Sequence, residues 1–325
     1  MPEHKMSEAT PDETPQQTPA EKEIRTREEF FAQFLERLQV PLVKSVAVGF
    51  FENIRQVESL VNMPFVMFSF LEVDAHILKA FTASVGEYWS RGVNYSTFLT
   101  EYNKQPPFNV AEVPDFMDRI QKRTETILSH PTYGRFLTSS MQVLYSAAIS
   151  ASWTAFECLA TDLWVASLNE RPQPLAQSAL SSLDVHEPGE LSGKQISVGL
   201  AAKYGFDLRH CLGTLLKPKF DFTSVSGIQK AYRVFTMDEF VRKIFAEPLL
   251  SELEATRHLI VHRASRVDEE YRKRTSSSRE LGSALTFSAE NASVFARTSE
   301  KAGFGLLAFV NDWFVRKGKT KSGTS

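Results

Sequence analysis

Residues 139–172, SSMQVLYSAAISASWTAFECLATDLWVASLNERP, decide the fold. The stretch mixes small and large apolar residues and contains neither glycine nor proline before Pro172. Because glycine and proline are the residues that most strongly interrupt a helix, the stretch predicts a continuous helix of roughly 30 residues. An average α-helix has only about 11–12 residues, so this one is long enough to be the central element of a helical domain.

Upstream of this stretch the pattern is also helical. Apolar residues recur at three- and four-residue steps, which is the period of a helix with one buried face: Phe30, Phe31, Phe34, Leu35 and Leu38. Pro41 then interrupts the pattern. Three further helices are expected before residue 131, over residues 43–61, 73–89 and 113–129. The stretch 63–70 lies between the first two, and a break at NKQPP precedes the last.

Downstream, proline and glycine predict a loop over residues 172–192. Short helices are expected near residues 196–204, 208–216 and 225–235. Asp238 has the character of an N-cap for a helix that runs to His262 and is kinked at Pro248. Residues 263–279 are charged and loop-like, and a final helix begins at about Ser288.

The chain shows no internal repeat and no convincing run of strands, so an all-α fold is predicted. A length of 325 residues is enough for two packed cores. We expect a disordered tail over residues 1–20, an N-terminal helical domain over 21–130, a second domain that is an antiparallel helical bundle over 135–316, and a basic flexible tail over 317–325. The 25 phenylalanines, which carry no polar group, should fill cores or interfaces.

Composition predicts a cytoplasmic protein. The two cysteines, Cys158 and Cys211, lie in apolar surroundings, which suggests buried thiols in a reducing compartment. The N-terminus lacks an apolar signal core, and the longest apolar-rich stretch, residues 63–71, is too short to span a bilayer. We therefore expect no membrane association. A net charge of −2 argues against wholesale wrapping by nucleic acid and leaves room for a local basic patch.

The segment whose side chains are best suited to catalysis is SELEATRHLIVHRASRVDEEY, residues 251–271. At 100° per residue an apolar stripe forms on its helix from Leu250, Leu253, Ile260 and Val261, and Arg257 falls inside that stripe. An arginine on an apolar face is costly unless something pairs with it, because its charge cannot be removed. Two interpretations follow: a structural ion pair, or an arginine held ready for a phosphate.

Glu254, His258 and His262 occur at four-residue steps along the edge of that stripe, so their side chains can face one neighbourhood. A lone histidine near an apolar face is usually a core residue. Two at this spacing, beside an unusual arginine, indicate chemistry, because a base that titrates near neutral pH next to a fixed cation suits metal-free phosphodiester cleavage.

The segment Arg257-His-Leu-Ile-Val-His262 resembles the R-x4-6-H motif of HEPN domains, in which a polar residue commonly follows the arginine. The helix containing SWTAFECLATDLW resembles the acid-bearing opening helix of that family. The similarity is to RiboL-PSP-type members, over residues 135–316. This sequence departs from many members in having His258 where they have asparagine, which leaves open which histidine transfers the proton.

The resemblance implies a metal-independent endoribonuclease of the toxin or antiphage type that dimerises and places two motifs in one cleft. In such an enzyme the RNA 2′-hydroxyl attacks the adjacent phosphate. It also implies roles for four residues. His262 would be the general acid or base, Arg257 would bind the scissile phosphate, and His258 and Glu254 would orient or supplement them. Expected partners are RNA, a second copy of the chain and an antitoxin or other partner protein.

The distribution of charged residues gives weak support to the ribonuclease interpretation. Residues 255–279 contain seven basic and three acidic residues, which could contact phosphates or simply form a solvated loop. Glu157 is a candidate ion-pair partner for Arg257, although it could equally emerge at the helix surface. A metalloprotease-type zinc site is disfavoured, because Leu259 stands where a glutamate would follow the first histidine. We predict neither a metal nor a cofactor.

Two alternatives to an enzyme remain. The first is a non-catalytic scaffold of the same family, in which Arg257 and His262 are a structural pair. The second is a helical protein-interaction module that uses phenylalanine-rich surfaces. The sequence leaves the role of residues 21–130 open.

Overall fold

The computed structural model of the chain describes residues 19–90, 115–182, 202–205, 207–208, 210–235 and 239–319. Of this part 81% is helical, and it contains no β-strand. Within the described residues, Arg266 and Ala284 form an isolated antiparallel β-bridge. The predicted all-α class is confirmed. The predicted tails lie largely outside the described residues, which begin at Pro19 and end at Lys319.

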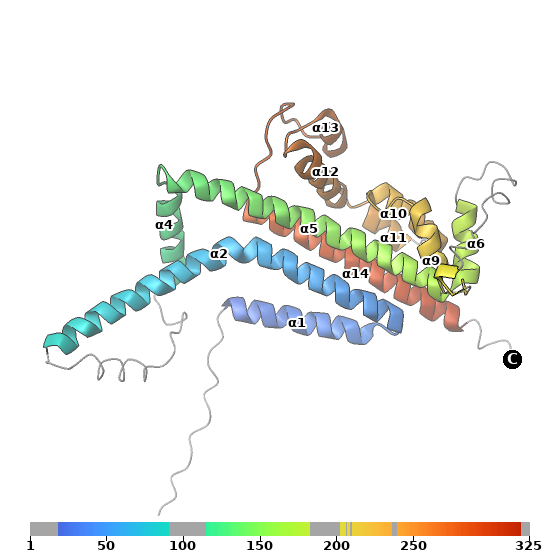
Figure 1. The fold of residues 1–325 in the computed structure, drawn as a ribbon, viewed down its shortest axis with the longest axis horizontal. Helices are drawn as coiled ribbons and strands as arrows, with labels where there is room; N and C mark the ends of the chain where they lie inside the picture. Colours follow the sequence, from blue (N-terminus) through green and yellow to red (C-terminus); the bar gives the residue numbers. More distant parts are fainter. Residues whose placement is uncertain are drawn as a thin grey trace, which may run out of the picture. The chain divides into compact units, whose positions relative to one another are not determined.

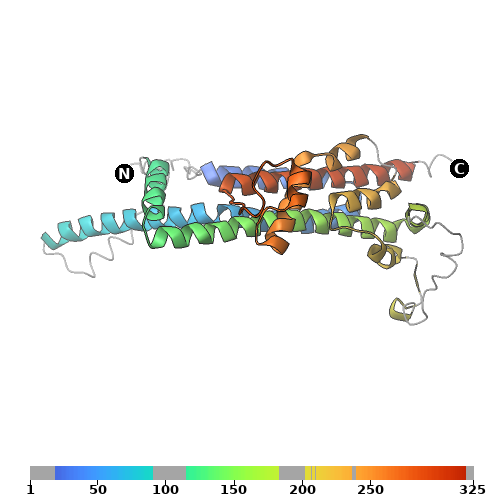
Figure 2. The same ribbon diagram turned by 90° about the horizontal axis from the view of Figure 1, so that it is seen from above.

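Two long helices form the centre of the larger compact unit, which comprises residues 33–65 and 130–325. Helix α5 (Tyr133–Glu170) and helix α14 (Ala289–Lys319) lie side by side along most of their length (Figures 1 and 2). The long helix predicted from residues 139–172 is confirmed, as one helix of 38 residues. Its side chains Trp153, Phe156 and Trp164 are fully buried. Burial of such aromatic rings supplies much of the hydrophobic free energy of a core.

Helix α5 is the one helix among the described residues that is long and apolar enough to cross a membrane. Half of the window that meets this criterion is buried inside the protein. A helix that is apolar because it is surrounded by protein passes the same test, so the finding fits the core helix of the bundle.

The first half of helix α2 (Pro41–Ser90) belongs to the same unit as α5 and α14. The ring of Phe304 on α14 lies 4.8 Å from Phe34 and 5.6 Å from Phe51, measured between centroids. The Asn311 side chain accepts hydrogen bonds from the backbone N–H groups of residues 39 and 40, at the start of α2. The larger unit therefore includes residues 33–65, which the sequence assigned to a separate domain over residues 21–130.

Helix α2 is also longer than predicted. The sequence suggested separate helices over residues 43–61 and 73–89, with the stretch 63–70 between them, but the helix runs without interruption to Ser90 with Pro64 inside it. A proline removes one backbone hydrogen bond and crowds the preceding turn, but Pro64 does not interrupt this helix. Residues 172–182, predicted as loop, form helix α6 (Pro172–Ser182), whose first position suits proline. The rest of that predicted loop, residues 183–192, lies outside the described residues.

Short helices cover the C-terminal part of α5 (Figure 1). They are α9 (Leu212–Leu216), η2 (Lys217–Lys219), α10 (Val225–Tyr232), η3 (Arg233–Phe235) and α11 (Glu239–Phe245). Hydrogen bonds join this group to α5: Trp164 donates to the Ala231 carbonyl at 2.9 Å, Tyr232 donates to the Ala160 carbonyl at 2.8 Å, and the Asn169 side chain accepts from the Gly213 N–H at 2.8 Å. The helices predicted near residues 208–216 and 225–235 are confirmed, whereas most of 196–204 lies outside the described residues.

The smaller unit comprises residues 1–32 and 66–129. Its described parts are most of α1 (Pro19–Arg37), the second half of α2, and α4 (Phe116–Leu128), which matches the helix predicted over 113–129. Ile120 of α4 is buried, and the guanidinium of Arg27 lies 6.0 Å from the centre of the Phe31 ring. The break predicted at residues 103–107 lies outside the described residues.

Candidate functional site

The four residues singled out by the sequence lie on helix α12 (Pro248–Arg263). The sequence predicted that Pro248 would kink one helix starting near Asp238. Instead α11 ends at Phe245 and α12 begins at Pro248, in the first turn, where a missing N–H costs nothing. Asp238 itself lies outside the described residues. Because α12 is separate, its direction is set by its own contacts with α5, α13 and α14.

The C-terminal end of α12 is closed tightly. Ala264 has a left-handed backbone conformation (φ 50°, ψ 43°), and the N–H of Ser265 donates to the Leu259 carbonyl at 3.0 Å. The N–H of Ala264 donates to the same carbonyl, so two bonds to Leu259 close the last turn. Glycine favours the left-handed position most, so the alanine here holds a mildly strained turn. The turn fixes the end of the helix that contains His262.

The burial of α12 changes along its length, so the predicted apolar stripe is wrong in its second half. Leu250 and Leu253 are fully buried as predicted, but Val261 is 51% exposed and Leu259, outside the predicted stripe, is fully buried. Helix α13 (Glu269–Thr275), which lies in the segment predicted as loop, packs against α12, as do α5 and α14. The exposed face in the second half of α12 is therefore the one that carries the two histidines.

Glu254 is buried between three elements. Its Oε2 accepts a hydrogen bond from the backbone N–H of Val225 at 2.8 Å, and its Oε1 pairs with Nη2 of Arg274 at 2.8 Å. Val225 is the first residue of α10, so the carboxylate satisfies a free N–H at the positive end of that helix. Arg274 lies on α13. Glu254 thus joins α12 to α10 and α13, and both of its oxygens are engaged.

Arg257 is partly buried one turn before the histidine that ends the motif. Among the described residues it forms no ion pair, and no hydrogen bond to its guanidinium is found there. The Glu157 carboxylate, its proposed partner, instead accepts a hydrogen bond from Nε1 of Trp153 at 3.0 Å on its own helix. A partly buried guanidinium with no protein acceptor retains its donors for another anion.

His258 and His262 are both exposed and lie one above the other on α12. Their ring centroids are 4.9 Å apart, and the ring planes make an angle of 47°. Neither ring has a hydrogen bond or ion pair within the described part of the chain. The predicted juxtaposition of these two side chains is therefore present, whereas Glu254, one turn earlier, faces the interior.

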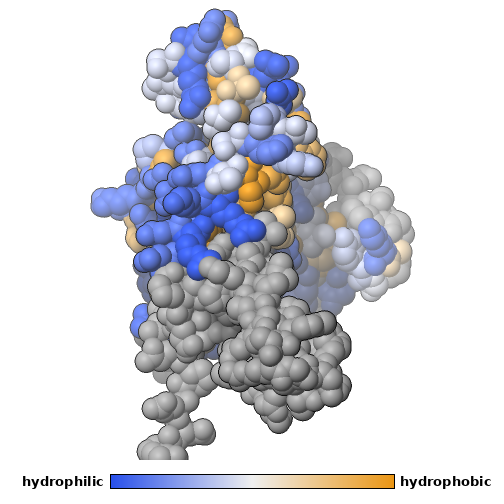
Figure 3. All heavy atoms as spheres, turned by 90° about the vertical axis from the view of Figure 1, so that its left-hand side faces the viewer, coloured by the Kyte–Doolittle hydropathy of each residue, from blue (hydrophilic) through white to orange (hydrophobic). Residues whose placement is uncertain are grey.

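The surroundings of the motif are basic, and three of the cations serve the fold. Arg274 pairs with Glu254, Arg263 lies 3.6 Å from Asp268, and Arg266 donates to the Gly282 carbonyl at 2.9 Å. The others have no ion pair with any described carboxylate: these are Arg257, Arg272, Lys273 and Arg279. The uppermost part of the molecule in Figure 3, formed by α13 and the segment after it, is accordingly largely hydrophilic.

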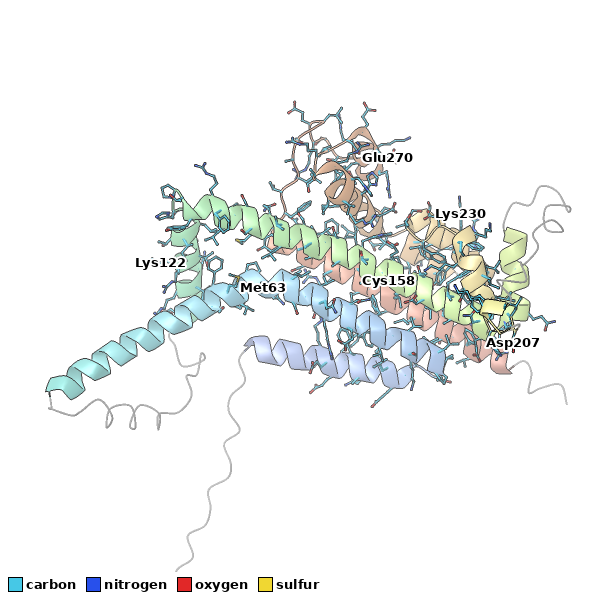
Figure 4. All side chains as sticks on the ribbon, in the orientation of Figure 1. Met63, Lys122, Cys158, Asp207, Lys230 and Glu270 are labelled. Atoms are coloured by element: carbon cyan, nitrogen blue, oxygen red, sulfur yellow. The ribbon has the colours of Figure 1, made fainter. Side chains whose placement is uncertain are left out.

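Cys158 departs from the sequence prediction. Cys211 is buried as expected, but Cys158 is exposed on α5, where Figure 4 labels it. Partial burial of the sulfur raises the pKa of the Cys158 thiol, and the nearby carboxylates of Asp162 and Glu157 raise it further. A thiol with a raised pKa is a poor nucleophile at neutral pH, so Cys158 is not a candidate for nucleophilic catalysis.

The ion pair between Glu254 and Arg274 is the contact of the candidate site that sequence reasoning missed. Arg274 stood in a run of charged residues that looked solvated, and no periodic signal linked it to a residue 20 positions earlier. Within the described residues no group of three or more histidine, cysteine or acidic side chains could together hold a metal ion. Chemically, the site offers two accessible imidazoles that can transfer protons, and a cation that has no counter-ion among the described residues.

Comparison with known proteins adds no assignment: no family model matches the chain, and no curated protein or solved structure shows significant similarity to it.

Proposed function

We propose that the chain is a metal-independent endoribonuclease of HEPN type, acting through Arg257 and His262. The observation that carries the proposal is the arrangement of charged and titratable side chains on α12. It holds a partly buried arginine with no counter-ion among the described residues, beside two exposed histidines whose rings lie 4.9 Å apart. A structural ion pair would require an acceptor near Arg257, and the expected one, Glu157, is bonded to Trp153.

The proposed reaction is a transesterification. The 2′-hydroxyl of the RNA attacks the adjacent phosphorus, the bond from phosphorus to the 5′-oxygen breaks, and a 2′,3′-cyclic phosphate forms. The proton lost by the 2′-hydroxyl goes to one imidazole, and the leaving 5′-oxygen takes a proton from another. His262 performs one of these transfers, and Arg257 stabilises the extra negative charge on the phosphate oxygens in the transition state.

His258 is placed to supplement His262, and Glu254 acts indirectly. Because its two oxygens are bonded to Val225 and Arg274, Glu254 fixes the position of α12 instead of touching the substrate. Arg272 and Lys273, on the neighbouring helix α13, would contact phosphates outside the cleaved bond.

The helix geometry favours a site shared by two chains. Arg257 and His262 are five residues apart, and at 100° per residue they lie about 140° apart around α12. One copy of α12 therefore directs them to different sides. In a homodimer formed by residues 135–316, with Arg257 near the two-fold axis, the arginine of one protomer can meet the histidine of its partner. Light scattering at micromolar concentration should find a dimer; a monomer would contradict a shared site, unless an antitoxin or other partner chain supplies the second motif.

The test is cleavage of single-stranded RNA by the purified protein in EDTA. We expect cleavage with cyclic phosphate ends and its loss in His262→Ala, with circular dichroism unchanged because the side chain is exposed. His210→Ala is the matched control, since His210 is also exposed and lies before α9, outside α12. Intact RNA under all conditions, or a requirement for added metal, would contradict the proposal.

A second candidate function is a non-catalytic scaffold or protein-interaction module. The structural engagement of Glu254 favours it, because a polar residue of the motif segment here serves the fold. Exposed apolar side chains at the start of α5 also favour it: Tyr133, Phe136 and Val143 are 64%, 71% and 68% exposed. Intact RNA combined with capture of a specific protein that Phe136→Ser abolishes would support this alternative.

A further inference from the structure

We propose that His258 and His262 form a two-histidine binding site for a divalent transition metal such as Zn²⁺, Ni²⁺ or Cu²⁺. The two residues are one helical turn apart on α12, so their side chains leave the same face of the helix. This spacing is the one at which paired helical histidines bind zinc in metalloproteases. The metal would be a regulator at this site, because the proposed cleavage chemistry requires none.

The ring separation matches what a shared metal needs. A Zn–N bond is about 2.0–2.1 Å long and a ring nitrogen lies about 1.1 Å from its centroid, so two imidazoles at a tetrahedral angle have centroids about 5 Å apart. The observed separation is 4.9 Å. The two side chains therefore lie at a separation that a shared ion requires, and binding would turn one nitrogen of each ring toward the ion.

Both imidazoles are accessible for coordination. They are exposed, and no hydrogen bond or ion pair within the described part of the chain occupies a ring nitrogen. Two arginines adjoin the pair in sequence. The Nε of Arg263 lies 3.6 Å from Oδ2 of Asp268, which partly offsets its charge, and Arg257 lies about 140° from His262 around the helix. The ring nitrogens are thus available to an incoming ion.

The coordination set also limits which metals bind. Glu254, one turn earlier, has both oxygens engaged with Val225 and Arg274 and cannot act as a third ligand. No third ligand from the described residues completes the site, so water would occupy the remaining positions. Two neutral imidazoles select zinc, nickel and copper, whereas magnesium and calcium prefer oxygen ligands. Affinity should rise from Ni²⁺ to Cu²⁺, following the general order for nitrogen ligands.

Metal bound here would inhibit the ribonuclease, and this consequence rests on the proposed function. A ring nitrogen that coordinates a metal cannot accept or donate the proton needed for cleavage. EDTA should then preserve activity, and Zn²⁺ should suppress it. The binding itself does not depend on RNA cleavage, so the two proposals can fail separately.

The test is isothermal titration calorimetry of metal-stripped full-length protein with ZnCl₂ and NiCl₂, with MgCl₂ as the comparison salt. We expect one ion per chain, no binding of Mg²⁺, and at least a tenfold loss of affinity in His258→Ala and in His262→Ala. His210→Ala, which removes an exposed histidine elsewhere, should bind as the wild type does. Equal affinity in the wild type and the two α12 variants, or no Zn²⁺ binding by the wild type, would overturn the metal site. Zn²⁺ binding by a protein that never cleaves RNA would keep the metal site and contradict the ribonuclease.

Discussion

Replacing Glu254 with alanine should destabilise the larger unit substantially. The substitution leaves the N–H of Val225 without its acceptor in a buried position and leaves Arg274 without its counter-ion. A hydrogen bond to a charged group contributes about 1.5–3 kcal/mol. The Arg274 side chain is 28% exposed, so its ion pair adds at most about 1 kcal/mol after solvent screening. The expected loss in free energy of unfolding is about 2–4 kcal/mol.

Differential scanning calorimetry measures this loss directly. For a domain of this size each kcal/mol lowers Tm by about 2–4 °C, so Glu254→Ala should lower Tm by about 5–15 °C. Glu254→Gln keeps an oxygen for the N–H of Val225 and should lose roughly half as much. Glu270→Ala is the matched control, because Glu270 is an exposed carboxylate on α13 (Figure 4) and should change stability by less than about 0.5 kcal/mol. Equal Tm values for Glu254→Ala and Glu270→Ala would refute the role assigned to Glu254.

Two further predictions concern the core and the exposed thiol. Gly303→Ala should destabilise the protein by about 1–2 kcal/mol despite the better helix propensity of alanine, because the added methyl would overlap the ring of Phe50. Gly49→Ala, where nothing lies within 4 Å of the new methyl, should stabilise the protein by up to about 1 kcal/mol. Urea titration measures both changes in unfolding free energy, and changes of the same sign for the two variants would contradict the packing described. Cys158 should react with iodoacetamide at pH 7 more slowly than an unstructured cysteine, because burial and Asp162 raise its pKa. Asp162→Asn should speed the alkylation of Cys158, which mass spectrometry can follow. An unchanged rate would contradict the claim that the Asp162 carboxylate raises the pKa of this thiol.

The sequence predicted the helices whose signals are local. The long helix α5 was expected because neither glycine nor proline interrupts residues 139–170. The break between the end of α1 and the start of α2 was expected from Pro41. Errors arose where packing outweighs local preference. Pro64 does not end α2, and α13 forms within a charged stretch because Tyr271 is buried and the Asp268 side chain caps its first turn.

The site could be predicted in part for the same reason. The spacing of His258 and His262 places them together on any helix, so their juxtaposition followed from the sequence. The surroundings depended on contacts between distant segments: Glu254 meets Val225 and Arg274, and no periodicity encodes either contact. That residues 33–65 belong to the larger unit could not be read from the sequence, because the Phe50 ring on α2 lies beside Gly303 on α14, more than 250 residues away in the chain.

The central claim is that Arg257 binds the substrate phosphate and does not serve the fold, and its substitution tests that claim most directly. We expect the free energy of unfolding of Arg257→Ala to lie within about 1 kcal/mol of the wild-type value, because the substitution leaves no described counter-ion unpaired. The same variant should lose RNA cleavage in EDTA. Arg257→Lys should also fold and should lose about 10²–10³ in cleavage rate, because an ammonium cannot reproduce the two-point geometry of a guanidinium on phosphate. Tm and cleavage rate are measured on the same preparations. Folded and inactive Arg257→Ala protein is the predicted result. A loss of about 3–5 kcal/mol in stability would show instead that Arg257 is a buried structural charge and contradict the account.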